Sequence, residues 1–144
     1  MRIRPATADD IPAMHEIRLS VRENRLSDPG RISAADYADA IGLLGRGWVA
    51  ERDGAVVGFA IGYSSGNVWA LFVDPAHEGR GVGGALHDAL VRWLERTGAS
   101  PLWLTTEPGT RAEAFYLARG WRARGAASDH EIRLERDVPG PVGP

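Results

Sequence analysis

The chain of 144 residues contains no cysteine, and this absence removes several kinds of chemistry at once. Disulfides, thiolate zinc sites and a cysteine nucleophile are all excluded, because each of them requires the thiol side chain. A strong charge of one sign is also missing, since 17 Lys and Arg stand against 19 Asp and Glu, a net charge of −2. We therefore expect no nucleic-acid partner, because such partners are held by clustered positive charge.

Long apolar runs are absent as well, although 44% of the residues are hydrophobic. No stretch approaches the 18 apolar residues of a membrane span, and the first ten residues carry charges where a signal peptide is apolar. The four histidines have no metal-ligand spacing, so we expect no metal site. These features predict a cytoplasmic protein without membrane contact, formed by a single domain over 1–138 and a disordered tail at 139–144.

Hydrophobic periodicity and turn signals predict an α/β protein with the element order β-α-α-β-β-β-α-β-α-β-β. The expected elements are a strand at 1–6, helices at 8–23 and 33–44, strands at 48–52, 55–63 and 68–73, a helix at 82–97, a strand at 102–106, a helix at 110–118, and a hairpin at 121–124 and 131–136. Gly45 and Gly47 are expected to stop the second helix, and Asp53-Gly54 predicts a tight hairpin turn. The apolar strand at 68–73 is expected to be buried on both faces.

The segment HEGRGVGGAL, residues 77–86, places four glycines at the start of a predicted helix. A plain flexible turn needs fewer glycines, and each one costs about 1 kcal/mol against alanine inside a helix. A dinucleotide fingerprint formally matches Gly79-x-Gly81-x-x-Gly84, but it requires the strand to run almost directly into the first glycine. The third interpretation is a pyrophosphate cradle, in which bare backbone N–H groups of 79–84 line one concavity at the positive end of the helix.

Two segments resemble the motifs of one known family, the GNAT-type N-acetyltransferases. VDPAHEGRGVG at 73–83 resembles the family's acetyl-CoA loop, whose pattern is Gln/Arg-x-x-Gly-x-Gly/Ala, and AEAFYLARGW at 112–121 resembles its A-x-x-F-Y-x-x-x-G-F/W segment. The predicted element order is the family's order too, so the resemblance covers residues 1–137. It implies a mixed, mostly antiparallel sheet of six to seven strands flanked by about four helices.

The resemblance also implies an activity: transfer of an acetyl group from acetyl-CoA to a primary amine of a small molecule or peptide, without a metal. In such enzymes the strand before the loop is splayed from its neighbour, and the pantetheine arm bonds to its main chain as an extra strand would. Tyr116 is then the general acid that protonates the departing thiolate. The implied donor-binding residues are Leu71, Phe72, Val73, Gly79, Arg80, Gly81, Val82, Gly83 and Gly84.

Four positions depart from the family's pattern. Glu78 replaces the first Gln/Arg of the loop motif and places a negative charge near a diphosphate unless its carboxylate points to solvent. Gly109 stands where the family often has an asparagine that bonds coenzyme A. Asn67 and Leu104 occupy the two positions at which relatives carry a glutamate as general base.

The general base therefore stays open between Glu107, Glu23, Asp28 and water alone. We expect the acceptor pocket between the segment joining the first two helices and the last hairpin. That segment, LSVRENRLSDPGR, is by default a solvated loop; if it lines the site, Glu23 or Asp28 binds an amine and an arginine binds a carboxylate.

Two other function classes compete with the acetyltransferase. The missing base residues leave open a non-catalytic acyl-CoA-binding or sensing module on the same fold. The formal glycine fingerprint leaves open an NAD(P)-binding oxidoreductase. The sequence does not determine the oligomeric state, for which a homodimer is the alternative to a monomer.

Overall fold

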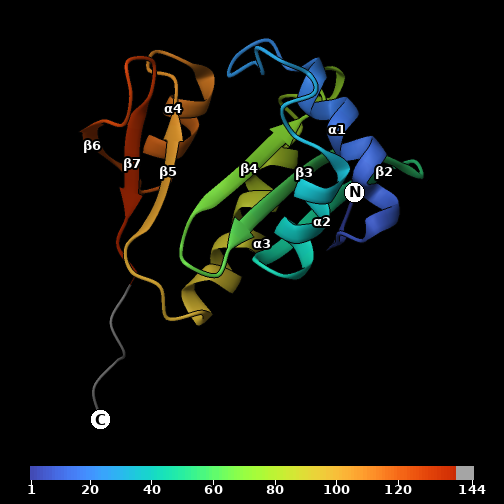
Figure 1. Ribbon diagram of the computed structural model, residues 1–144, viewed down its shortest axis with the longest axis horizontal. Helices are drawn as coiled ribbons and strands as arrows, with labels where there is room; N and C mark the ends of the chain where they lie inside the picture. The colour runs from blue at the N-terminus through green and yellow to red at the C-terminus, as the bar shows by residue number, and fades with distance from the viewer. Residues whose placement is uncertain (139–144) are drawn as a thin grey trace.

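The computed structural model describes residues 1–138 and divides seven strands between two antiparallel sheets (Figure 1). The first sheet has the order β1-β2-β3-β4 and the second has the order β5-β7-β6. The strands are β1 (Arg2–Pro5), β2 (Gly45–Arg52), β3 (Ala55–Tyr63), β4 (Val68–Val73), β5 (Leu102–Thr106), β6 (Arg122–Ala126) and β7 (Ile132–Arg136). The predicted fold class is confirmed, whereas the tail predicted to be disordered, 139–144, lies outside the described residues.

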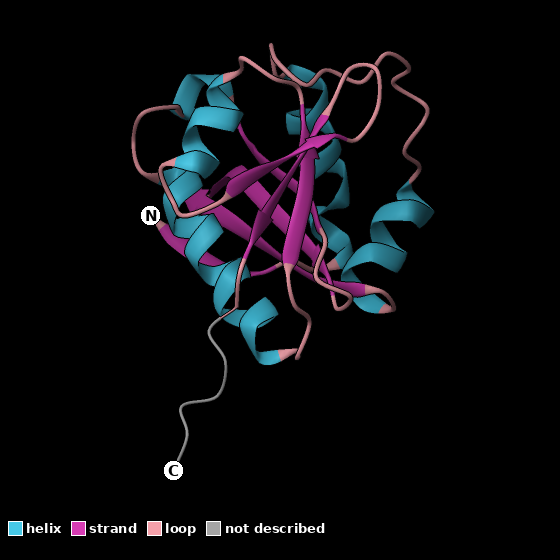
Figure 2. Cartoon of the chain, turned by 90° about the vertical axis from the view of Figure 1, so that its left-hand side faces the viewer, coloured by secondary structure: helices cyan, strands magenta, loops and turns pink. Residues whose placement is uncertain are grey.

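Four helices flank these sheets, as predicted, and two 3₁₀ turns precede α1 and α3. They are η1 (Ala8–Asp10), α1 (Ile11–Ser20), α2 (Ala34–Gly42), η2 (Pro75–His77), α3 (Val82–Arg96) and α4 (Arg111–Leu117). α1 and α2 cover one face of the first sheet, α3 covers the other, and Figure 2 shows the strands between the helices. α4 packs beside β6.

Two clusters of buried side chains form the core. Met14, Tyr37 and Phe59 belong to the cluster between the first sheet and the helices α1 and α2. Leu90 belongs to the second cluster, which joins α3 to both sheets. A Cβ atom at Gly62 of β3 would lie 2.5 Å from the Leu90 side chain, so the glycine lets α3 approach the sheet closely.

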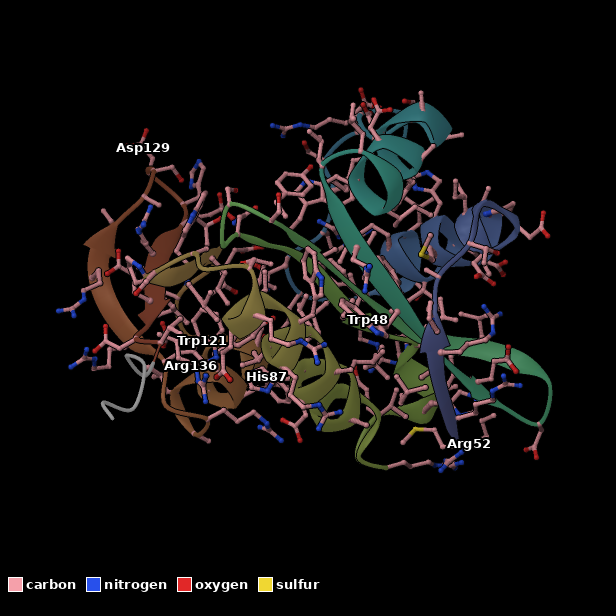
Figure 3. All side chains as sticks on the ribbon, turned by 90° about the horizontal axis from the view of Figure 1, so that it is seen from below. Trp48, Arg52, His87, Trp121, Asp129 and Arg136 are labelled. Atoms are coloured by element: carbon pink, nitrogen blue, oxygen red, sulfur yellow. The ribbon has the colours of Figure 1, made fainter. Side chains whose placement is uncertain are left out.

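A buried polar pair connects α3 to the residue that precedes β6. The Trp121 indole N–H donates to His87 Nε2 at 3.0 Å, and both residues are buried (Figure 3). His87 Nδ1 lies 3.1 Å from Asp88 Oδ1, which fixes the tautomer with the proton on Nδ1. Burial lowers the pKa of His87, because the charged imidazolium would lose its hydration there.

Local turn chemistry agrees with the sequence at most boundaries. Ser33 accepts from the Asp36 N–H and completes the predicted capping box of α2. Asp53 and Gly54 both have positive φ, 53° and 78°, which is the type I′ geometry that suits a two-residue hairpin.

Two predicted boundaries were wrong. The first helix ends at Ser20 and not at 23, because Val21 is already extended. Gly45 and Gly47 do not stop α2; both lie in β2. A Cβ atom at Gly45 would lie 1.9 Å from the Gly62 carbonyl oxygen, so this glycine allows close pairing of β2 with β3.

Candidate functional site

β4 and β5 are neighbours at one end only, and they diverge along their length. A parallel bridge joins Asn67 to Trp103, where the Trp103 N–H donates to the Gly66 carbonyl at 3.0 Å and the Asn67 side chain donates to the Trp103 carbonyl at 3.3 Å. Asn67 therefore fastens the two sheets together. The splayed strand implied by the resemblance is present.

The divergence leaves β4 as an edge strand whose last residues, 71–73, are only half-buried. The expectation of a strand buried on both faces was therefore wrong for these residues. The Asp74 N–H donates to the Val57 carbonyl at 2.8 Å, which fixes the direction of the backbone groups that precede it. Because these directions alternate in an antiparallel pair, Phe72 bonds toward β3, while Leu71 and Val73 present their N–H and C=O groups to the gap.

A cavity of about 520 Å³, here called the glycine-loop cavity, opens beside this free edge. All the predicted donor-binding residues except Arg80 line it. Arg80 lies instead at a surface hollow beside Arg2 and residues 51–54.

The glycine loop offers bare backbone to this cavity. Gly79 and Gly81 have φ values of 74° and 80°, and a Cβ atom at either would meet nothing within 4 Å. Gly81 is also the N-cap of α3 and supplies no side-chain cap, so the first N–H groups of that helix have no side-chain acceptor at the cap. An anion fits this position, because unpaired N–H groups and the positive end of the helix dipole coincide there.

The other two glycines of the loop lie close to side chains from the region of α4. A Cβ atom at Gly83 would lie 3.5 Å from the Phe115 ring, and one at Gly84 would lie 3.1 Å from the Arg119 guanidinium. A side chain at position 83 would thus make ordinary contact with Phe115, and one at position 84 would require only the flexible end of Arg119 to shift.

Basic side chains that the sequence reasoning missed line the glycine-loop cavity. His77, Arg111 and Arg119 line it, and the Arg119 guanidinium stacks on the Phe115 ring at 3.7 Å from its centroid. For Arg119 the sequence did contain a signal. Ala112, Phe115, Tyr116 and Arg119 stand at i, i+3, i+4 and i+7, a spacing that places them on one face of a helix.

The negative charge of Glu78 is balanced by an ion pair with Arg111. Its carboxylate accepts from Arg111 Nη1 at 2.9 Å. The backbone N–H of Arg111 in turn donates to the Glu23 carboxylate at 3.0 Å. These two bonds connect the glycine loop, the start of α4 and the segment that follows α1, so they close one side of the cavity.

A second cavity of about 390 Å³, here called the hairpin cavity, lies between the segment joining α1 to α2 and the hairpin of β6 and β7, where an acceptor pocket was predicted. Glu107 lines it, together with the buried side chain of Leu104. Glu23 lines the other cavity, where its carboxylate is bonded to Arg111. Asp28 lines neither cavity, and its carboxylate accepts from the Gly30 N–H at 2.9 Å.

Asn24 holds the segment after α1 against the end of β5. Its φ is 54°, a left-handed conformation that asparagine tolerates better than most residues. Its side-chain oxygen accepts from the Glu107 N–H at 2.9 Å and lies 3.4 Å from the Thr106 hydroxyl. Asn24 therefore lines both cavities, a position that the sequence reasoning missed.

Tyr116 lines both cavities as well, at the junction between them. Its ring is held by edge-to-face contacts with Phe115 and Trp121, whose centroids lie 5.2 and 5.5 Å away. Only 6% of the residue is exposed, and this burial raises the pKa of its phenol. Tyr116 therefore stays protonated at neutral pH and can donate a proton at the junction.

The topology excludes the dinucleotide interpretation for the described residues, because β4 pairs antiparallel with β3 and a doubly wound sheet needs parallel strands there. Within residues 1–138, no group of acidic or histidine side chains is arranged to hold a metal ion. In the same range, no helix has both the length and the apolar character needed to cross a membrane.

Comparisons with known proteins agree with this geometry. The model of the Acetyltransferase (GNAT) family matches residues 11–121. An L-2,4-diaminobutyric acid acetyltransferase of Nocardia farcinica is 38% identical over 84 residues, which are 54% of this chain and 44% of the relative. The chain thus spans less than half the length of that curated relative.

Solved structures share the fold. The ribosomal-protein-S18-alanine N-acetyltransferase of Escherichia coli superposes with a TM-score of 0.78 at 21% identity, over 98% of this chain and 96% of that one. The yncA protein of Salmonella typhimurium, solved with its cofactor acetyl-CoA, gives a TM-score of 0.78 at 20% identity over 100% and 97%.

Proposed function

The chain belongs to the Acetyltransferase (GNAT) family, and on that premise we propose that it transfers an acetyl group from acetyl-CoA to a primary amine. The observation that carries this proposal is the meeting of two cavities at Tyr116. One is built from bare backbone that suits a diphosphate, and the other is lined by charged side chains that suit an amine.

The glycine-loop cavity is the proposed donor site. The N–H groups of Gly79 to Gly84 and the start of α3 face the diphosphate, and Arg119 adds positive charge. The free backbone groups of Leu71 and Val73 are available to an amide-bearing arm that adds to β4 as a strand would. The pairing of Glu78 with Arg111 supports this assignment, because it offsets the one carboxylate that departs from the family's loop motif.

The chemistry at the junction balances with one acid and one proton acceptor. The amine nitrogen forms a bond to the thioester carbonyl carbon, the carbon–sulfur bond breaks, and the thiolate takes a proton from the Tyr116 hydroxyl. The proton that the amine loses passes to water and then to Glu107, the carboxylate among the proposed base candidates that lines the hairpin cavity. The tyrosinate regains its proton from solvent in a later step.

A small molecule is the acceptor class that the comparisons favour. The Nocardia relative is named for a small diamino acid and matches this chain over 84 residues. The E. coli structure is named for a ribosomal protein's alanine, but its 21% identity carries only the fold. A peptide acceptor is therefore the second candidate.

Ligand titration followed by thermal unfolding tests the donor. Acetyl-CoA at about 100 times its dissociation constant should add about 2.7 kcal/mol to the free energy of unfolding, a rise in Tm of about 5–10 °C. NAD(P) should give no rise at the same concentration. Stabilisation by NAD(P) but not by acetyl-CoA would overturn the proposal.

Release of free thiol from acetyl-CoA with a panel of primary amines tests the transfer itself. Turnover above the amine-free background supports the enzyme. Stabilisation by acetyl-CoA with no thiol release from any amine would favour the non-catalytic binding module instead.

A further inference from the structure

Arg18 of α1 brings an unpaired cation to the wall of the hairpin cavity. Its guanidinium lies over the Phe72 ring, with the central carbon 4.2 Å from the ring centroid. Its Nη1 atom is buried and has no hydrogen-bond partner among residues 1–138. Because Arg18 lines the hairpin cavity, a group that enters the cavity can approach its guanidinium.

Two other partly buried arginines, Arg4 and Arg136, do have carboxylate partners. Arg4 makes two bonds of 2.8 Å to Asp10, and Arg136 makes one of 2.8 Å to Glu95. Burial without such a partner lowers the pKa of Arg18, because the cation has lost hydration that no carboxylate replaces. A partly buried arginine without an anionic partner destabilises the folded protein. A ligand that supplies this anion would account for an arginine at this position.

The hairpin cavity also contains carboxylates, besides the basic side chains of Arg25, Arg31 and His130. Glu107 and Glu131 line it from the β5 end and the hairpin, and Glu131 lies 3.3 Å from the Thr105 hydroxyl of β5. Arg18 stands against Phe72 of β4, the strand that diverges from β5. A ligand between the two strands therefore meets a guanidinium on one side and carboxylates on the other.

We propose that the acetyl acceptor is an amine that also carries a carboxylate, and that Arg18 binds this carboxylate in the hairpin cavity. The planar guanidinium matches a carboxylate through two parallel bonds, whereas an amine alone offers it no acceptor. Phe72 and Tyr116 line both cavities, so a carboxylate on Arg18 lies beside the junction and the acceptor is small. The proposal rests on the proposed function, since it assigns the second substrate of the same site.

Matched pairs of amines test the proposal with the unaltered protein. Each pair differs only in the carboxylate: 2,4-diaminobutyrate with 1,3-diaminopropane, ornithine with putrescine, and lysine with cadaverine. We expect kcat/KM from thiol release to be about 10- to 100-fold higher for the carboxylate member of the best pair. Equal rates within every pair, or faster reaction of the decarboxylated members, would overturn the proposal while leaving the acetyltransferase intact.

Arg18→Met keeps a flexible stem on the Phe72 ring and removes the charge. It should reduce kcat/KM for the preferred amino acid about 10- to 100-fold, mainly through KM, and change the rate with its decarboxylated partner less than twofold. Its Tm should be equal to or above that of the wild type, because the unpaired cation is gone. A purely structural Arg18 would instead give a lower Tm and equal losses for both amines.

Arg46→Met is the matched control. Arg46 also stands over an aromatic ring, with its guanidinium carbon 5.7 Å from the Trp93 centroid, but it lines neither cavity. It should leave the preference within each pair unchanged.

Calorimetric titration of the same pairs in the presence of coenzyme A separates this proposal from the proposed function. Binding of amino acids that is lost in Arg18→Met, without turnover of any amine, would support the carboxylate site and refute the transferase. No binding of any amino acid to the wild type would overturn the carboxylate site.

Discussion

The two cavities that meet at Tyr116 are lined by different parts of the polypeptide. The glycine-loop cavity takes one wall from backbone, namely the free edge of β4 and one continuous loop that leads into α3, and the rest from side chains of α4 and the segment after α1. The hairpin cavity is made of side chains from separate segments, including α1, β4, the end of β5 and the β6–β7 hairpin. A site formed by backbone N–H groups requires closely spaced glycines, which are visible as a motif in the sequence. A site formed by side chains from distant segments produces no local motif. The sequence therefore predicts which donor the protein binds, but it does not predict the acceptor.

The largest effect is expected at the junction that the two cavities share. Tyr116→Phe should reduce kcat about 100-fold or more, the usual contribution of a general acid, while coenzyme A affinity measured by calorimetry changes less than twofold. Because burial raises the pKa of Tyr116, ionisation of the wild-type residue should cause no loss of rate between pH 7 and 10. Unchanged turnover in Tyr116→Phe would remove the acid from the mechanism.

Gly81→Ala tests whether the first cavity depends on bare backbone. The left-handed φ of 80° should cost about 1–2 kcal/mol of stability with alanine, and the added methyl group should weaken coenzyme A binding about tenfold, as read by calorimetry.

Gly54→Ala is the control for this variant, because Gly54 has a φ of 78°, equally open space around its Cβ direction, and a place in the β2–β3 turn. It should lose similar stability and keep full coenzyme A affinity. Equal affinity losses in the two variants would mean that the strain alone, and not the position in the loop, weakens binding.

A smaller effect is expected from the ion pair at the mouth of the glycine-loop cavity. Arg111→Gln exposes the Glu78 charge and should weaken coenzyme A binding about fivefold, or about 1 kcal/mol, as measured by calorimetry. Adding Glu78→Gln to that variant should restore most of the affinity. If the double variant binds as weakly as Arg111→Gln, Arg111 acts directly on the ligand.

The last prediction concerns His87, which lines neither cavity but packs beside the Tyr116 ring. Its folded-state pKa is lowered by burial, so the unfolded chain binds its proton first and stability falls as the pH drops below about 6.5. The loss is at most about 1.4 kcal/mol per pH unit. Urea unfolding at pH 7, 6 and 5 should show a shallower decline in His87→Gln, and an identical decline would exclude His87 as its source.

Local patterns predicted the elements that local chemistry determines. The capping box at Ser33, the turn at Asp53-Gly54 and the helix after the glycine loop are each set by residues close in sequence. The glycines at 45 and 47 were misread, because their role is set by a partner strand far along the chain. Pairing with β3 therefore determines the conformation of these glycines, and the local helix-stop pattern does not.

The same distinction applies to the site. Tyr116 and the loop glycines carry motifs, so their positions could be predicted. The hydrogen bonds of Asn24 to the end of β5 join residues more than eighty positions apart, so no local sequence pattern predicts them. Arg18 was visible only as one arginine among several until the fold placed it unpaired over Phe72.

Residue-resolved amide hydrogen exchange, measured with and without coenzyme A, tests the central claim most directly. Bound coenzyme A should slow exchange at Leu71, Val73 and the loop amides 79–84, while Phe72 is already protected by β3 and changes little. Residues 128–131 of the hairpin cavity should be unaffected. Protection of the hairpin with none at the β4 edge or the glycine loop would contradict the assignment of the two cavities.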